Sequence, residues 1–597
     1  MSTNGLDRRG FLRLFAVAAA SAAAAACGRA APDGSGELLE TALAPPASPT
    51  SAPSPTAAPQ KPLLTGQDAE VWANNKAVQV SAPPGCDQVF VYANGQPVEA
   101  ARAGESYNAE LPIQRGENRV WAICRQPDGD EVRSNMVTYE GRLREAPKAI
   151  IKIAIQDGRV ILDGGESQPS QPGGRLVSDH VWTVRPGNPA PLLLPSSGGI
   201  PEREFSGEVS DRTIVLLQPV VDGEYYVRLL VKDEAGRQDR AEIYFVVENG
   251  QPSIPDYATE NTAWVEQAII YGVIPNKFGR PAFKTITERL PYLAELGVNA
   301  LWLAPVNVSP PDDYGYAVVD YFDLNRSYGS KEDFHRLVQE AHALGIRVLM
   351  DFVPNHSSAQ HPYYQDALRH GKESEYYDFY HRDESSAVTH YFDWTHLPNL
   401  NYDNPQVVNM MLEAFSYWVR EFDVDGFRVD VAWGIRQRNP EFWPRWREEL
   451  MRIKPDLLLL AEASARDPYY FDYGFDAAYD WTDQLGHWAW ELVWDSYKHR
   501  QLAYNLHDAL TNRPQGFHPD ALIFRFLNNN DTGERFITKQ GEAMARISTV
   551  MLLTLPGIPC IYTGDEIGAE FHPYQNPEPL SWIEQYPGLR DFHKQLI

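Results

Sequence analysis

Eight short apolar runs alternate with helix-like stretches between residue 255 and the C-terminus of this 597-residue chain. They are AIIYGVI (268–274), NALWLA (299–304), IRVLMDF (346–352), DGFRVDV (425–431), DLLLLAE (456–462), the weaker FDAAYDW (475–481), ALIFRFL (521–527) and IPCIYTG (558–564). Strands that read as continuous apolar runs are buried on both faces, as in parallel sheets covered by helices. The alternation predicts a (β/α)8 TIM barrel in preference to an open doubly wound sheet.

One of the intervening helices is explicit in residues 330–345, SKEDFHRLVQEAHALG. Ser330 is the expected N-cap and Gly345 the expected stop. The helix is predicted to present one apolar face, made of Phe334, Leu337, Val338, Ala341 and Leu344.

Charged side chains follow several of the strand-like runs, and in a barrel of this kind chemistry belongs at the C-terminal ends of the strands. Arg428 and Asp430 are i and i+2 neighbours, so they face the same side of the sheet. A guanidinium beside a carboxylate keeps the acid ionised, as a nucleophile requires, although a purely structural ion pair is the alternative.

Further polar residues end three other runs. Glu462 follows four leucines, where burial raises a carboxyl pKa and keeps a proton for a leaving group. Asp351, Asn355 and His356 lie in DFVPNH, and Asp531 ends NNND, a composition that also fits a simple turn. Two carboxyls with opposed pKa requirements and a third acid together predict retaining glycoside hydrolysis.

Four segments carry a family resemblance: DFVPNH (351–356), GFRVDVAW (426–433), LLLLAEAS (457–464) and FLNNNDT (526–532). In this order they resemble the hallmark segments of the α-amylase family, glycoside hydrolase family 13. The resemblance extends to GYAVVDYF (315–322), LPNLNYDNPQV (397–407) and LPGIPCIYTGDEIG (555–568), and so covers the chain from about residue 260 to its end.

The resemblance implies a role for each matching residue. Asp430 would be the nucleophile, Glu462 the general acid and base, and Asp531 the carboxylate that holds hydroxyls of the distorted sugar in the −1 subsite. Arg428 would orient the nucleophile, Tyr316 would stack on the sugar and His356 would form a hydrogen bond with it. Asp351 matches a position that supports the site structurally.

Two positions depart from the family pattern. Asn530 stands where the family has His, which predicts weaker catalysis or altered substrate choice because Asn cannot carry charge. Trp433 and Gly434 replace a Lys-His pair, so Trp433 is expected to form an aromatic platform for the acceptor. The resemblance implies no required cofactor, while Asn355 matches a calcium-ligand position and leaves calcium open.

A short aromatic insertion, about 357–400, follows the third predicted strand. It resembles the small B domain of the neopullulanase, cyclomaltodextrinase and oligo-1,6-glucosidase branches, and Val431 also occurs in the 1,6-acting branch. The resemblance leaves open whether α-1,4 or α-1,6 bonds are cleaved, and whether the sugar passes to water or to another sugar. The β-sandwich that usually follows this barrel is absent, and RDFHKQLI at 590–597 reads as the start of a last helix, so a truncated chain is expected.

The N-terminus predicts export. Residues 1–27 place Arg8 and Arg9 before a short Ala-rich run and resemble a twin-arginine signal, and Cys27 resembles a lipobox cysteine. An ordinary cleaved signal with an incidental Cys is the alternative. Residues 28–63, rich in Pro, Ala, Ser and Thr, predict an extended tether. A surface lipoprotein or an extracellular or periplasmic protein is therefore expected, with a lipid anchor as its membrane link.

Two all-β modules are predicted between the tether and the barrel, which begins at about residue 253. Residues 64–145 and 146–252 show alternating runs with NG, DGD and similar turns, and the second resembles a PKD or other Ig-like domain. Cys86 and Cys124 are expected to pair across the sheets of the first module, and Cys560 to be a small buried residue.

The function expected from these features is that of a retaining α-glucan hydrolase or transglycosylase with an α-glucan or maltooligosaccharide substrate. The net charge of −27 and pI near 5.0 argue against a nucleic-acid partner. The alternative from another class is a non-catalytic glucan-binding or cell-surface scaffold protein with a degenerate barrel, toward which Asn530 would be a step.

Overall fold

The structure is a computed structural model that describes residues 61–170, 174–176, 180–196, 202–311, 313–482, 484–495, 500–576 and 578–597. The predicted signal, lipobox and nearly all of the predicted tether lie outside the described residues. No helix among the residues described combines the length and the apolar character needed to cross a bilayer.

The first β module is built from two sheets that enclose an apolar core. One sheet has the order β1 (Leu63–Thr65), β3 (Asn75–Ser81), β7 (Ser106–Pro112), β6 (Ala101–Ala103). The other has the order β2 (Ala69–Val71), β9 (Glu131–Gly141), β8 (Gly116–Arg125), β4 (Gln88–Ala93), β5 (Gln96–Glu99). The burial of alternate residues in β3, β4 and β7 is the pattern expected of strands with one face toward a core.

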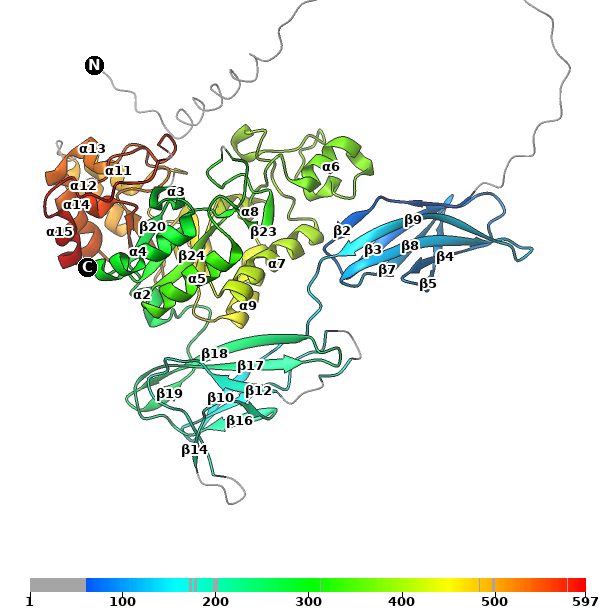
Figure 1. The fold of residues 1–597 in the computed structure, drawn as a ribbon, viewed down its shortest axis with the longest axis horizontal. Coiled ribbons are helices and arrows are strands. Elements are labelled where there is room, and N and C mark those ends of the chain that lie inside the picture. The colour runs from blue at the N-terminus through cyan, green and yellow to red at the C-terminus, as the bar shows by residue number, and fades with distance from the viewer. Residues whose placement is uncertain are drawn as a thin grey trace, which may run out of the picture. The chain divides into compact units, whose positions relative to one another are not determined.

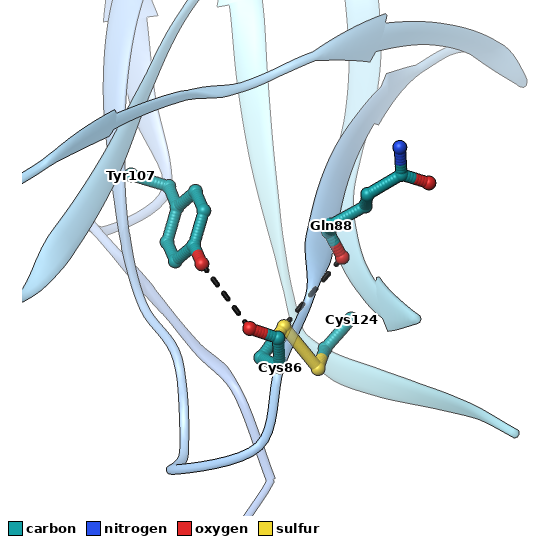
Figure 2. Close-up of a disulfide and its surroundings, with 4 residues drawn as sticks. All are labelled: Cys86, Gln88, Tyr107 and Cys124. Carbon is teal, nitrogen blue, oxygen red and sulfur yellow. Dashed lines mark hydrogen bonds between the residues drawn. A yellow bond between two sulfur atoms is a disulfide. The ribbon is translucent and has the colours of Figure 1, made fainter. Parts of the chain in front are cut away.

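Cys86 and Cys124 form the predicted disulfide, with their Cα atoms 5.7 Å apart (Figure 2). The prediction that it crosses between sheets is wrong. Cys86 lies just before β4 and Cys124 lies in β8, and these two strands pair with each other in one sheet. Cys560 is fully buried and unpaired, as predicted.

The second β module also has an apolar core, formed between short antiparallel sheets. Its sheet orders are β10 (Lys152–Gln156), β11 (Arg159–Asp163), β16 (Thr213–Leu216); then β15 (Val209–Ser210), β12 (Val181–Val184), β17 (Gly223–Lys232), β18 (Gln238–Glu248), β19 (Gln251–Ser253); and β13 (Leu193–Leu194) with β14 (Arg203–Glu204). The hairpin of β17 and β18 supplies two long antiparallel strands within the all-β module predicted for residues 146–252.

The predicted apolar runs close into one parallel barrel (Figure 1), so the TIM-barrel prediction is confirmed. Its strands are β20 (Ile270–Val273), β21 (Ala300–Leu303), β24 (Arg347–Phe352), β25 (Gly426–Val429), β26 (Leu458–Ser464), β27 (Ala477–Tyr479), β28 (Leu522–Phe526) and β29 (Ile558–Tyr562). Even the weak run FDAAYDW contributes β27. Because the strands are parallel and the sheet is closed, their C-terminal ends share one rim.

Helices and short ribbons connect the barrel strands (Figure 1). The helices are α2 (Ala263–Glu266), α3 (Pro275–Phe278), α4 (Ala282–Leu296), α5 (Lys331–Ala343), α7 (Pro405–Phe422), α8 (Ala432–Arg438), α9 (Phe442–Ile453), α10 (Tyr469–Asp472), α11 (Ala489–Asp495), α12 (Leu502–Thr511), α13 (Phe536–Gln540), α14 (Glu542–Thr554), η4 (Asp565–Ile567) and α15 (Leu589–Leu596). The ribbon β22 (Asn307–Val308) and β23 (Asp320–Leu324) follows β21.

Helix α5 forms as predicted, with one exception. Ser330 and Asp333 make a reciprocal capping box, and the predicted apolar residues from Phe334 to Ala341 are buried. Leu344 is instead 43% exposed, because the helix ends at Ala343 and Leu344 is its C-cap.

The segment between β24 and β25 contains α6 (Pro362–His370) and the short 3-10 turns η1 (Gly371–Glu373), η2 (Tyr377–Phe379) and η3 (Tyr391–Asp393). The first β module contacts this segment. Trp72 stacks on Phe322 with ring centroids 5.3 Å apart, and its indole N–H donates to the hydroxyl of Tyr363 in α6 at 2.9 Å. Trp72 thereby joins the apolar core of the barrel.

Candidate active site

Asp430 and Arg428 lie side by side where β25 ends. The Arg428 Nη1 group donates to Asp430 Oδ1 and to Asp351 Oδ1, each at 2.8 Å. Asp351 is the register partner of Arg428 on the neighbouring strand β24, so sheet pairing brings the two together. The predicted i, i+2 arrangement of Arg428 and Asp430 is confirmed, and the arginine also fixes a second carboxyl.

Glu462, on β26, completes this group. Its Oε1 atom lies 3.3 Å from Arg428 Nη2, and its Oε2 atom accepts a hydrogen bond from the Val431 backbone N–H at 2.8 Å. Val431 has a φ of 49°, a left-handed conformation that is costly for a β-branched residue. This backbone turn, directly after Asp430, aims the N–H group at the Glu462 carboxyl. We refer to Asp351, Arg428, Asp430 and Glu462 as the acid cluster.

Burial and neighbouring charges act on the acid cluster together with Arg428. Burial and the charge of Glu462 raise the pKa of Asp430 well above its usual range, although the Arg428 guanidinium acts in the opposite direction. Burial raises the pKa of Asp351 to about 6, again against the effect of Arg428. Arg428 therefore favours the ionised form of Asp430, as predicted, while burial and the charge of Glu462 oppose it.

Tyr316 and His356 lie next to the acid cluster, with partners inside the protein. The Tyr316 hydroxyl donates to Asp351 Oδ2 at 3.1 Å. The His356 Nε2 group donates to the Tyr316 carbonyl at 3.1 Å, and Nδ1 accepts from the Asn355 side chain at 3.0 Å. Burial lowers the pKa of His356 to about 3, which makes the ring neutral.

His356 is therefore placed as a positioning residue for Tyr316. Both of its ring nitrogens have protein partners, and the predicted hydrogen bond between His356 and a sugar stays a prediction. The stacking of Tyr316 on a sugar stays a prediction.

Asp531 follows β28, on the same rim. Asn529 Oδ1 accepts hydrogen bonds from the backbone N–H groups of Asp531 at 2.8 Å and Thr532 at 3.0 Å, so NNND is a turn as well as a candidate site. The pKa of Tyr562 in β29 is raised, mainly by burial and also by the charges of Asp531 and Asp351. The Tyr562 ring therefore lies near both carboxyls.

Asn530, the departure from the family pattern, has a tyrosine partner. Its Nδ2 group donates to the hydroxyl of Tyr574 at 2.9 Å, and the same hydroxyl donates to Asp531 Oδ1 at 3.4 Å. Tyr574 was missed from sequence, since nothing local links position 574 to position 530.

Aromatic rings gather around Trp433 at the start of α8. The ring centroid of Trp433 lies 5.8 Å from that of Phe392 and 6.2 Å from that of Tyr391, both in η3. The Trp433 indole N–H is buried and has no hydrogen-bond partner among the residues described. A partly buried indole beside the acid cluster fits the predicted aromatic platform, whose role stays a prediction.

The residues around Asn355 do not fit a calcium ion. The Arg438 Nη2 group donates to Asn355 Oδ1 at 2.6 Å and to the Asn355 carbonyl at 3.1 Å, so a cation already holds both oxygens. A side chain at Gly434 would place its Cβ 2.3 Å from the same Oδ1 atom, which explains the glycine. Calcium requires six to eight oxygen ligands, usually with carboxylates among them. The proposed ligand role of Asn355 is therefore not supported.

Two further partners of the acid cluster were missed from sequence. The Tyr479 hydroxyl accepts from Arg428 Nε at 3.0 Å, and the Trp302 indole N–H donates to Asp351 Oδ2 at 3.2 Å. Both residues end or nearly end a barrel strand, β27 and β21 respectively. Their position near the strand ends was the only sequence signal of a site role. An aromatic residue in a buried strand is otherwise interpreted as part of the hydrophobic core.

Comparison with known proteins agrees with this geometry. Residues 275–578 match the alpha-amylase catalytic domain. The chain is 31% identical over 343 residues to the alpha-amylase MalA of Haloarcula japonica, an alignment covering 56% of this chain and 48% of that protein. It is 33% identical over 320 residues to the maltogenic alpha-amylase of Bacillus acidopullulyticus, covering 49% and 50%.

A third relative is the cyclomaltodextrinase of Geobacillus thermopakistaniensis, 32% identical over 343 residues, which cover 51% of this chain and 56% of that protein. The chain thus spans about half the length of the curated relatives it matches. The matched segment includes the whole acid cluster as well as Asp531 and Tyr574. With more than half of its residues matched to this catalytic domain, the chain belongs to the alpha-amylase family.

Proposed function

We propose that this protein is a retaining α-glucan hydrolase or transglycosylase that cleaves α-1,4 or α-1,6 glucosidic bonds through a glycosyl-enzyme intermediate. The observation that carries the proposal is the contact of one buried arginine, Arg428, with both Asp430 and Glu462 on the C-terminal rim of the barrel. Two carboxyls held beside each other in this way are the machinery of retaining glycoside hydrolysis.

In the first step, an Asp430 oxygen attacks the anomeric carbon while Glu462 gives its proton to the departing glycosidic oxygen. In the second step, Glu462 takes a proton from water or from an acceptor hydroxyl, and that oxygen displaces Asp430. Arg428 orients the Asp430 carboxylate in both steps, and Asp531 holds hydroxyls of the distorted sugar. The Val431 N–H group fixes the Glu462 carboxyl in both steps.

The substrate class is supported by the relatives, whose names include maltogenic alpha-amylase and cyclomaltodextrinase. The scaffold alternative is not favoured, because inactive barrels typically lose the acids, whereas Asp430, Glu462 and Asp531 are all present.

The test compares the protein with Asp430→Asn on maltooligosaccharides, pullulan, isomaltose and sucrose, with products and anomers followed by NMR. We expect α-anomeric first products from the wild type on at least one substrate, and none from the variant. Equal behaviour of the two proteins on every substrate would contradict the enzyme proposal. First products in the β-configuration would contradict the retaining mechanism.

We also propose that the chain is exported and anchored through Cys27. The disulfide between Cys86 and Cys124 supports this location, because such bonds persist in oxidising compartments. Mass spectrometry of the mature N-terminus after fractionation tests it: a diacylglyceryl group on Cys27 is the expected result. An unmodified protein in the cytoplasmic fraction would contradict it.

We further propose that the two β modules belong to the Ig-like class and that residues 357–400 form a B domain.

A further inference from the structure

Tyr574 lies in the segment after β29 and η4, and its side chain reaches the turn after β28. Its hydroxyl accepts a hydrogen bond from Asn530 Nδ2 at 2.9 Å and donates one to Asp531 Oδ1 at 3.4 Å. One tyrosine oxygen therefore bridges the two residues that end NNND. The bond to Asp531 is at the long end of hydrogen-bond distances, so a better acceptor can replace it.

Contacts with Tyr314 and His572 hold Tyr574 in place. Tyr314 packs edge-on against it with ring centroids 4.8 Å apart, and the Tyr314 hydroxyl donates to the Tyr574 carbonyl. The Tyr574 backbone N–H donates to the His572 ring at 3.3 Å. These contacts fix the ring without using its hydroxyl, which is the arrangement expected of a preorganised binding group.

Tyr574 is also close to the residues expected to surround the sugar. It contributes to the raised pKa of Tyr316, after burial and Asp351 as the larger causes. Tyr314 and Tyr316 lie on one short segment, residues 313–317, where Asp313 Oδ1 accepts hydrogen bonds from the N–H groups of Gly315 and Ala317, both at 2.8 Å. The turn of this segment thus links Tyr316, which contacts Asp351, to Tyr314, which contacts Tyr574.

Asn530 offers an unused acceptor at this point. The residue is only 6% exposed, and its Oδ1 atom has no hydrogen-bond partner within the described parts of the chain. A buried amide oxygen without a partner is costly, and a ligand hydroxyl that donates to it removes the cost. A sugar hydroxyl both donates and accepts, so it can donate to Asn530 Oδ1 while accepting from the Tyr574 hydroxyl.

We propose that Asn530 and Tyr574 form one neutral binding unit for a hydroxyl group of the sugar ring beside Asp531, which makes Tyr574 a specificity-determining residue. The inference rests on the proposed function. When the sugar binds, its hydroxyl takes the Tyr574 hydrogen bond that Asp531 receives in the free protein. Asp531 is then released to accept from the sugar itself.

The test uses Tyr574→Phe, which removes only the oxygen, and Tyr504→Phe as a matched control on the 74% exposed Tyr504. Each protein is assayed on α-D-glucosyl fluoride and on its 2-, 3-, 4- and 6-deoxy analogues. We expect Tyr574→Phe to lower kcat/KM on the parent compound by about 10- to 100-fold. On the analogue that lacks the contacted hydroxyl, this loss shrinks to less than about threefold, as a coupled pair requires.

An equal loss on all five substrates would overturn the inference, because it would indicate a general structural effect. Full activity of Tyr574→Phe on every substrate, with Asp430→Asn inactive, would overturn the inference while leaving the proposed function intact. A wild type inactive on the parent fluoride and on all glucans would overturn both. Thermal unfolding of Tyr574→Phe within about 2 °C of the wild type is expected, since the ring and its contacts with Tyr314 remain.

Discussion

The two halves of the barrel rim are organised differently. In the acid cluster, on β24 to β26, the contacts join residues at the end of one strand, as in Arg428 with Asp430, or on neighbouring strands, as in Asp351 with Arg428, both at 2.8 Å. Elsewhere on the rim, on what we call the loop side, contacts form through segments that leave the strands: Tyr574 joins Asn530 and Asp531, and Trp433 packs against Tyr391 and Phe392. Atoms on the loop side, Asn530 Oδ1 and the Trp433 indole N–H, are buried without partners in the described chain. We therefore expect sheet register to set the chemistry and the loops to set the choice of substrate.

The largest effect is expected from Asp430→Asn, which should lower kcat/KM by about 10⁴-fold or more because the nucleophile is lost. Asp403→Asn, on an exposed carboxyl, is the matched control and should be neutral. With Asp430→Ala and added azide, α-glucosyl fluoride should yield β-glucosyl azide, identified by NMR. Formation of the α-azide by this variant would show that the acid cluster does not attack from the Asp430 side.

Glu462→Gln should produce the next largest effect, a loss of about 10²- to 10⁴-fold on glucans, because proton transfer to the leaving group is removed. α-Glucosyl fluoride needs no such proton, so its glycosylation rate should fall far less. The exposed Glu441→Gln serves as control.

The same variant tests the coupling within the acid cluster. The charge of Glu462 raises the pKa of Asp430, so removing that charge should lower this pKa. Asp430 must be ionised to attack. The acidic limb of the pH–rate profile on α-glucosyl fluoride should therefore move to lower pH in Glu462→Gln. A limb that stays in place or moves to higher pH would refute the coupling.

Trp433→Ala tests the expected role of the loop side. Loss of an aromatic acceptor platform should lower the ratio of transfer to hydrolysis products by about tenfold or less, because stacking on one ring contributes only about 1 kcal/mol. Hydrolysis of α-glucosyl fluoride, which has no sugar leaving group, should change by less than about twofold. Product analysis by chromatography measures the ratio, with Tyr504→Ala as the surface control. An equal loss on both reactions would place Trp433 with the chemistry instead.

The smallest effect concerns metal removal. Since Arg438 holds both oxygens of Asn355, chelation by EDTA should leave the melting temperature of the wild type unchanged to within about 1 °C. Arg438→Met should lower the free energy of unfolding by about 1–3 kcal/mol, since the two oxygens lose their donor. Arg436→Met, on the half-exposed neighbour, is the control. A large EDTA effect on the wild type that added calcium reverses would contradict the fit at Asn355.

Much of the acid cluster was predictable because its geometry is local. Arg428 and Asp430 share a face of one strand by the period of two, and Glu462 ends a leucine run whose burial is evident. Leu344 shows the limit of such patterns, since helical periodicity continues past the residue where the helix stops. The disulfide shows another limit: the two cysteines pair, but the pattern of runs did not reveal that their strands are neighbours in one sheet.

The sequence by itself determined the barrel, the order of its strands and the acids at their ends, because hydrophobic periodicity and strand polarity act over a few residues. Only the tertiary structure decided which groups complete them. It brought Tyr574 to Asn530 and Arg438 to Asn355 across long stretches of chain, and it raised the pKa of Asp430 by burying it beside Glu462. Such contacts depend on how loops pack over a closed barrel, and no local pattern of residues encodes that packing.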